Sequence, residues 1–117
     1  MKRKTIRIEN GMVAVPGDVK MSICEIADLF DIFYQTAKRH IRAIEESGIT
    51  GGDYSMCCTV VGQKVYPEYY GLDMIIAVAF RVQNRNTMLF REWVMKRVVS
   101  QDITAILMLS LQNAWLN

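Results

Sequence analysis

The stretch of sequence that decides the fold is SICEIADLFDIFYQTAKRHIRAIE, residues 22–45. It opens with a capping-box pattern, because the side chains of Ser22 and Glu25 can each satisfy an unpaired backbone N–H at the start of a helix. Apolar residues then recur at helical spacing as far as Phe30, which gives the segment one apolar face. The pattern predicts a short amphipathic helix that begins at Ser22.

A break at residues 31–33 separates this helix from a second one, which we expect over residues 34–46. A close crossing of two helices needs a small residue on the first, and Ala27 supplies it. Asp31 stands at the turn, where the backbone is often left-handed, and Asp is one of the few residues besides Gly that tolerate this conformation. Ile32 would fill the space between the helices. Together these features predict a helix-turn-helix.

The outer side of the second helix carries polar groups that suit DNA. With Ala37, Ile41 and Ile44 turned inward, five side chains fall on the opposite side, namely Tyr34, Gln35, Lys38, Arg39 and Arg42. We expect the basic members of this group to hold phosphates or guanines, and its tyrosine and glutamine to read base edges in the major groove. A solvated face on an ordinary helical hairpin is the competing interpretation.

Two β-hairpins are expected beside this region. Residues 4–15 alternate in polarity around an Asn-Gly pair, which is a strong signal for a two-residue turn. Residues 56–66 flank a Gly-Gln pair and follow the second helix, where a wing is expected. Lys64 at its tip would touch a phosphate if the hairpin is a wing. A hairpin that only completes the fold explains the pattern equally well.

The last third of the chain is expected to form three helices. Residues 72–82 are almost wholly apolar, so this helix should be buried on most sides. A second helix is expected over residues 87–98, and Asp102 can cap a final one over residues 103–116. The final helix is apolar around most of its circumference, so part of it would meet a second copy of the chain or complete the monomer core. We expect a homodimer, because two half-sites also suit a helix-turn-helix.

The net charge of +2 over 117 residues neither requires nor excludes a nucleic-acid partner. Whether the chain binds nucleic acid therefore has to be judged from the distribution of its charges. A second basic group in the last third either extends a phosphate-binding surface or keeps an exposed surface solvated, and it consists of Arg81, Arg85, Arg91, Lys96 and Arg97.

Composition and spacing argue against other classes of protein. The three cysteines lack the spacing of a metal finger, and the single histidine offers no second imidazole, so we expect no metal and no cofactor. There is no phosphate-binding glycine loop and no arrangement for nucleophilic catalysis, so we expect neither an enzyme nor a small-molecule substrate. No apolar run reaches the roughly 20 residues of a membrane span, and no signal core follows the start. We expect the protein in the cytoplasm, without a membrane partner.

Three segments resemble the sequence pattern of a known family. Residues 19–41, VKMSICEIADLFDIFYQTAKRHI, and residues 70–82, YGLDMIIAVAFRV, resemble two blocks of the virulence protein RhuM family in the same order. Phe90-Arg91-x-Trp93 with the following Lys96 resembles a third block. The resemblance covers roughly residues 6–98.

The resemblance implies a prokaryotic DNA-binding protein, often of a mobile or phage-derived region, without catalytic activity. The chain departs from the family pattern at Asp31 and Ala79, where glycine is usual, so the local geometry is expected to differ there. Family members also continue well beyond the third block, and any activity of their later part is not expected here.

The sequence as a whole predicts an α+β fold, a winged helix-turn-helix-like domain with two β-hairpins and a C-terminal helical subdomain. We expect a single domain over residues 1–117, made of an N-terminal hairpin (1–18), the helix-turn-helix with its wing-like hairpin (19–69) and a helical part (70–117). The expected function is transcriptional regulation through double-stranded DNA. The alternative is a protein-interaction or assembly module that has the helix-turn-helix shape without binding DNA.

Overall fold

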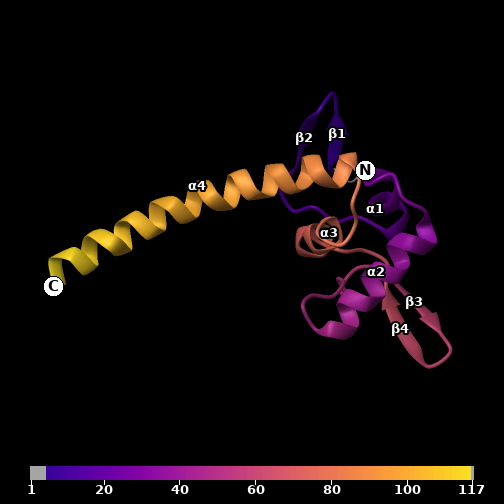
Figure 1. Ribbon diagram of the computed structural model, residues 1–117. Coiled ribbons are helices and arrows are strands. Elements are labelled where there is room, and N and C mark those ends of the chain that lie inside the picture. The colour runs from indigo at the N-terminus through magenta and orange to yellow at the C-terminus, as the bar shows by residue number, and fades with distance from the viewer. Residues whose placement is uncertain (1–4, 117) are drawn as a thin grey trace.

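The chain folds as a mixture of helices and small antiparallel hairpins (Figure 1). The computed structural model describes the backbone of residues 5–116 and the side chains of residues 5–100. In this part of the chain there are two two-stranded hairpins and four helices, in the order β1-β2-α1-α2-β3-β4-α3-α4. The expected α+β class is confirmed.

The first hairpin pairs β1 (Arg7–Glu9) with β2 (Met12–Ala14), and Ile8 lies opposite Val13. Asn10 and Gly11 form its turn with φ angles of 54° and 75°. A two-residue turn with both φ angles positive matches the right-handed twist of paired strands, which is why Asn-Gly is favoured there. The hairpin expected from the sequence is confirmed.

Helix α1 (Ile23–Leu29) begins with the expected capping box. The Glu25 N–H donates to Ser22 Oγ over 3.2 Å, and the Ser22 N–H donates to Glu25 Oε1 over 2.9 Å. The two bonds satisfy backbone donors that have no partner within the helix. They fix the point at which α1 begins.

The turn after α1 reverses the chain through a left-handed residue. Asp31 has a φ of 52°, and the Ile32 N–H donates to the Ala27 carbonyl over 3.0 Å. Helix α2 (Tyr34–Ser47) follows and ends at Gly48, whose φ is 79°. Glycine adopts this left-handed backbone conformation without strain, so Gly48 serves as the C-terminal cap of α2. The order of helix, turn and helix is as the sequence predicted.

The second hairpin pairs β3 (Cys58–Val61) with β4 (Lys64–Pro67) around Gly62, whose φ is 63°. Upstream of it, Gly52 packs directly under Pro67. A Cβ atom at Gly52 would lie 2.1 Å from Pro67 Cγ, so only glycine fits. The segment before the hairpin is therefore held tightly at this point.

The helical part of the chain differs from expectation. Helix α3 (Leu72–Ala79) ends three residues before the expected position 82, and α4 (Arg85–Leu116) is one continuous helix instead of two. No Gly or Pro occurs between residues 85 and 116, so nothing in the sequence ends α4 near residue 100. Residue 102, expected as a cap, falls inside the helix. The expected dimer surface over residues 103–116 lies outside the side chains that are described.

The start of α4 is tied to the end of α1. Asn84 and Thr87 cap α4 reciprocally, since the Thr87 N–H donates to Asn84 Oδ1 over 2.9 Å and the Asn84 N–H donates to Thr87 Oγ1 over 3.0 Å. The Asn84 side-chain amide also donates to the Phe30 carbonyl over 2.6 Å, and that of Asn86 donates to the Leu29 carbonyl over 3.0 Å. These bonds lock the two helix ends together.

One apolar core holds the elements in place, with α3 at its centre. Met74, Ile75 and Val78 of α3 are fully buried, and the Phe30 and Phe90 rings meet with centroids 5.6 Å apart. Burying one such side chain contributes about 1.5–3 kcal/mol relative to leaving it exposed. Of the helices in the described residues, none combines the length and apolar character needed to cross a membrane.

Candidate nucleic-acid interface

Helix α2 presents a polar face away from the core. Its inward residues Ala37 and Ile41 are fully buried, and Gln35 and Arg39 are exposed on the opposite side. Residues three or four positions apart share one side of a helix, so Gln35 and Arg39 form a single outward edge. The structure places both where the sequence predicted them.

The charged side chains of α2 are arranged in the order that does not compensate the helix dipole. The helix has no side-chain cap and no acidic residue in its first turn, and its last turn has no basic residue. Glu45 and Glu46 lie instead near the C-terminal end, where the partial charge of the helix is already negative. The beginning of α2 is therefore its electropositive end, which suits an anion such as phosphate.

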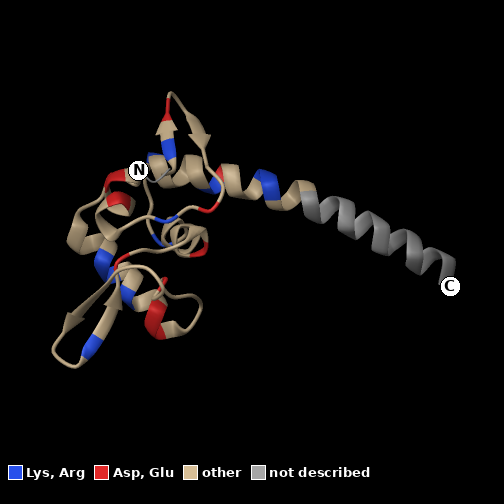
Figure 2. Cartoon of the chain, turned by 180° about the vertical axis from the view of Figure 1, so that it is seen from behind, with Lys and Arg blue, Asp and Glu red and all other residues tan. Residues whose placement is uncertain are grey.

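A groove of about 730 Å³ separates α2 from the β3–β4 hairpin. Lys38 lines it from the helix and Lys64 from the hairpin, and Tyr34 lies at the helix start. Its lining also includes three carboxylates, from Glu45, Glu46 and Glu68. Figure 2 shows basic residues on α2 and on the neighbouring hairpin. Four predicted site residues line this groove, namely Tyr34, Lys38, Arg42 and Lys64.

Arg42 does not point freely outward, which corrects the orientation expected from the sequence. Its Nη1 donates to Tyr70 Oη over 2.8 Å and to Glu45 Oε1 over 3.1 Å, and its guanidinium lies 4.1 Å over the Tyr66 ring. Only 25% of the side chain is exposed. The expected position was wrong because helical periodicity does not show the hairpin that packs beside this edge of α2. Arg42 braces α2 against the hairpin and the segment before α3.

The Tyr70 hydroxyl completes this brace. It accepts the bond from Arg42 and donates to Glu45 Oε1 over 2.8 Å. Burial, followed by the hydrogen bond and negative charge of Glu45, raises the pKa of Tyr70 above its ordinary value. The phenol therefore stays protonated and available as a donor. Sequence reasoning missed Tyr70, since its partners lie 25 and 28 residues away and no local pattern connects them.

His40 is held as a neutral acceptor on the other flank of α2. Arg81 Nε donates to His40 Nδ1 over 3.2 Å. Burial lowers the pKa of His40, and the nearby positive charges of Arg81 and Arg39 lower it further. A neutral imidazole can accept this bond, and a protonated one cannot. Two exposed arginines, Arg39 and Arg81, are therefore near enough to His40 to act on its charge.

The second basic group has mixed roles. Arg91 is structural, because its Nη1 donates to the Ala79 and Val82 carbonyls over 2.8 Å each and so closes the end of α3. Arg97 lies 4.7 Å over the Trp93 ring. Arg81, Arg85 and Lys96 are exposed. Of the five members of this group, Arg91 therefore serves the fold, and the other four remain on the surface.

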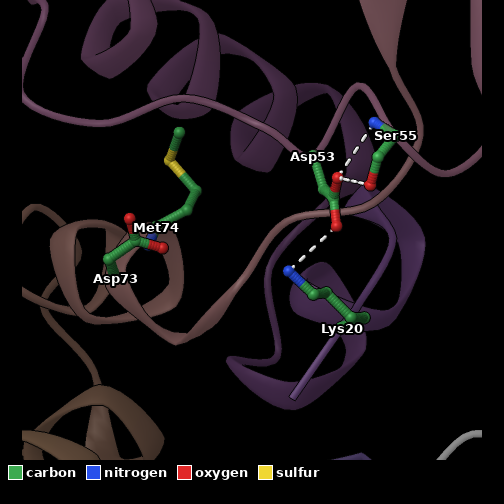
Figure 3. Close-up of polar contacts among 5 residues, drawn as sticks. All are labelled: Lys20, Asp53, Ser55, Asp73 and Met74. Carbon is green, nitrogen blue, oxygen red and sulfur yellow. Dashed lines mark hydrogen bonds and ion pairs between the residues drawn. The ribbon is translucent and has the colours of Figure 1, made fainter. Parts of the chain in front are cut away.

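A tether in the segment before the hairpin was also missed by sequence reasoning. Lys20 Nζ lies 3.0 Å from Asp53 Oδ2, and the Ser55 N–H donates to Asp53 Oδ1 over 2.9 Å (Figure 3). The hydrogen bonds from Ser55 and then from Lys20 lower the pKa of Asp53 to about 2. The Thr50 hydroxyl bonds Asp73 in the same region. These contacts position the segment that leads into β3.

The described residues contain no group of three His, Cys, Asp or Glu side chains that could hold a metal ion. Cys24, Cys57 and Cys58 are free thiols. Comparison with known proteins found no match among family models, curated proteins or solved structures.

Proposed function

We propose that the chain binds double-stranded DNA, with α2 in the major groove and the β3–β4 hairpin against the phosphate backbone. The observation that carries the proposal is the arrangement of four polar side chains around one edge of the domain. Gln35 and Arg39 are exposed on the outer face of α2, and Lys38 and Lys64 line the groove beside it from opposite sides. This combines groups that read bases with groups that hold phosphates.

The proposal assigns a role to each of these side chains. The Gln35 amide suits the N6 and N7 edge of adenine, and the Arg39 guanidinium suits guanine or a phosphate. Lys38 and Lys64 carry compact positive charges, which suit phosphates that lie along the groove between α2 and the β3–β4 hairpin. Arg42 is not assigned a base or a phosphate, because its Nη1 donates to Glu45 and Tyr70 and its guanidinium lies over the Tyr66 ring.

The charge distribution along α2 supports contact through its first half. The N-terminal residues of a recognition helix are those that reach base edges. In α2 this end lacks acidic residues, and the carboxylates of Glu45 and Glu46 lie near the other end, where they would repel phosphates. DNA would therefore approach the beginning of α2.

We also propose that the chain acts as a homodimer through α4. Met95, Val98 and Val99 are exposed on α4 at helical spacing, with 47%, 44% and 42% of their surface accessible. All residues from 95 to 100 are exposed, so this part of α4 leaves the surface of the domain (Figure 1). A second copy would cover this apolar stripe and present a second α2. From the resemblance to the RhuM family we further propose that the chain regulates a mobile or phage-derived region and acts in a prokaryotic cytoplasm.

A second candidate function is an assembly module without DNA binding. It is favoured by Val60 and Val65, which lie opposite each other in the hairpin and are 66% and 48% exposed. An exposed apolar pair on a two-stranded hairpin is a surface for another protein. This candidate predicts binding that is indifferent to the charges of α2.

The test is binding of the purified chain to duplex DNA at two salt concentrations. Each phosphate contact contributes about −0.9 to the slope of log affinity against log salt. The Lys38→Ala/Arg39→Ala double variant should weaken binding, with a slope shallower by about 1.8 if both residues hold phosphates. An Arg7→Ala/Arg85→Ala variant is the matched control, since it removes two exposed charges outside α2 and outside the proposed dimer surface of α4.

Two results would contradict the proposal. The first is absence of binding at low salt. The second is equal DNA binding by the wild-type chain and the Lys38→Ala/Arg39→Ala variant, which would leave α2 without a role in contacting DNA. Only the first result would favour the assembly module.

A further inference from the structure

Phe33 is the most exposed large apolar side chain in the described part of the molecule. It is 84% exposed and stands immediately before the first residue of α2. The adjoining Ile32 packs against the core. The chain therefore turns Ile32 inward and leaves Phe33 in solvent at the end of α2 that the proposed function directs toward DNA.

The backbone holds Phe33 in this position. The left-handed turn at Asp31 and the bond from the Ile32 N–H to the Ala27 carbonyl set the direction of the chain. Phe33 itself is extended, with φ −70° and ψ 149°, and its carbonyl accepts the Ala37 N–H over 3.0 Å. Both sides of the residue are thus anchored, and the ring is presented without rearrangement.

Phenylalanine is an unfavourable choice here for the stability of the chain. The position before a helix favours Ser, Thr, Asp or Asn, whose side chains bond the free N–H groups, and Phe33 makes no such bond. Its ring is also left in water, where apolar surface is unfavourable. Two local costs at one position indicate that the ring is used in a contact outside the chain.

We infer that Phe33 is a specificity-determining residue that contacts the C5-methyl group of thymine in the major groove. This inference rests on the proposed function. Thymine is the only one of the four bases that presents a methyl group there, and Phe is a side chain that contacts it. Gln35 lies two residues further and is exposed. Its amide matches adenine, so both side chains at the start of α2 select A·T base pairs.

The experiment begins by selecting bound sites from a randomised duplex pool with the wild-type chain and with Phe33→Ala. The wild type should enrich A·T at a defined position, and the variant should lose that enrichment. Each thymine of the selected site is then replaced by deoxyuridine, which removes the methyl group and keeps the base pairing. One replacement should weaken wild-type binding about fourfold, the equivalent of about 0.8 kcal/mol for one buried methyl-sized group.

Two variants make the result specific to the ring. Phe33→Ala should bind the thymine and deoxyuridine sites equally. Ile49→Ala removes another exposed apolar side chain, 74% accessible and just beyond the other end of α2, and should keep the full difference.

The outcomes separate this inference from the proposed function. If the chain binds DNA in a salt-dependent way, any of three results overturns the role of Phe33 and leaves the DNA-binding proposal intact. These are the absence of A·T enrichment, the absence of a deoxyuridine effect, and a deoxyuridine effect of the same size in wild type and Phe33→Ala. Absence of DNA binding overturns both.

Discussion

The guanidinium of Arg42 lies 4.1 Å from the centroid of the Tyr66 ring. Arg42 belongs to α2 and Tyr66 to β4, so this contact joins the helix to the hairpin across their shared groove. The same guanidinium bonds Tyr70 and Glu45. One side chain therefore fixes the hairpin, α2 and the segment before α3 relative to one another.

Replacing this residue should destabilise the fold. Arg42→Ala leaves the Glu45 carboxylate, of which 17% is exposed, without its cation and should lower the free energy of unfolding by about 1–3 kcal/mol. Urea denaturation measures the change. Arg39→Ala removes an exposed arginine from the same helix and should change the free energy by no more than about 0.5 kcal/mol. Equal losses in the two variants would show that Arg42 is not a brace.

The two adjacent glycines before the hairpin offer a matched test of packing. Gly52→Ala places a methyl group 2.1 Å from Pro67 Cγ, and overpacking of this kind costs about 1–3 kcal/mol. Gly51→Ala meets nothing within 4 Å and should leave stability nearly unchanged. Thermal or urea unfolding of both variants checks the difference. A Gly52→Ala variant as stable as Gly51→Ala would show that the contact with Pro67 is not maintained in solution.

His40 should make stability depend on pH. Its pKa in the folded chain is lowered from 6.5 by burial and by Arg81 and Arg39, so the unfolded chain takes up a proton first as the pH falls. The contribution of the neutral His40 side chain to the free energy of unfolding is therefore fully present above about pH 6.5. It is lost progressively as the pH falls below this value and through the pKa of His40 in the folded chain.

Urea unfolding from about pH 7.5 to about pH 5 measures this dependence, across the ordinary range of a histidine. The His40→Asn variant has no imidazole to protonate and should lose less stability than the wild type over that range. Identical losses would mean that the histidine is equally free to protonate in both states.

Local signals predicted much of the fold. The capping box at Ser22, the left-handed turn at Asp31 and the glycine at position 48 each act through neighbouring residues, so the bounds of α1 and α2 follow from short patterns. The continuity of α4 was not predicted, because Asp102 can cap a helix and is also tolerated inside one.

The candidate site was predicted in part. Gln35 and Arg39 follow from helical periodicity alone, and the structure leaves them exposed. The role of Arg42 depends on Tyr66 and Tyr70, which belong to segments far along the chain. Periodicity places a residue on the side of a helix, but it does not show what packs against that side.

The end of α1 depends on side chains that lie more than 50 residues further along the chain. The carbonyls of Leu29 and Phe30, at the end of α1, accept their bonds from the amides of Asn86 and Asn84. A fragment of residues 19–69 would lose these donors, and with them the support for the turn that aims α2. In synthesis order, α2 emerges before the groups that orient it. The turn before α2 is therefore fully supported only when the start of α4 has folded back against α1, so the smallest unit that keeps this geometry includes the beginning of α4 and not the helix pair alone.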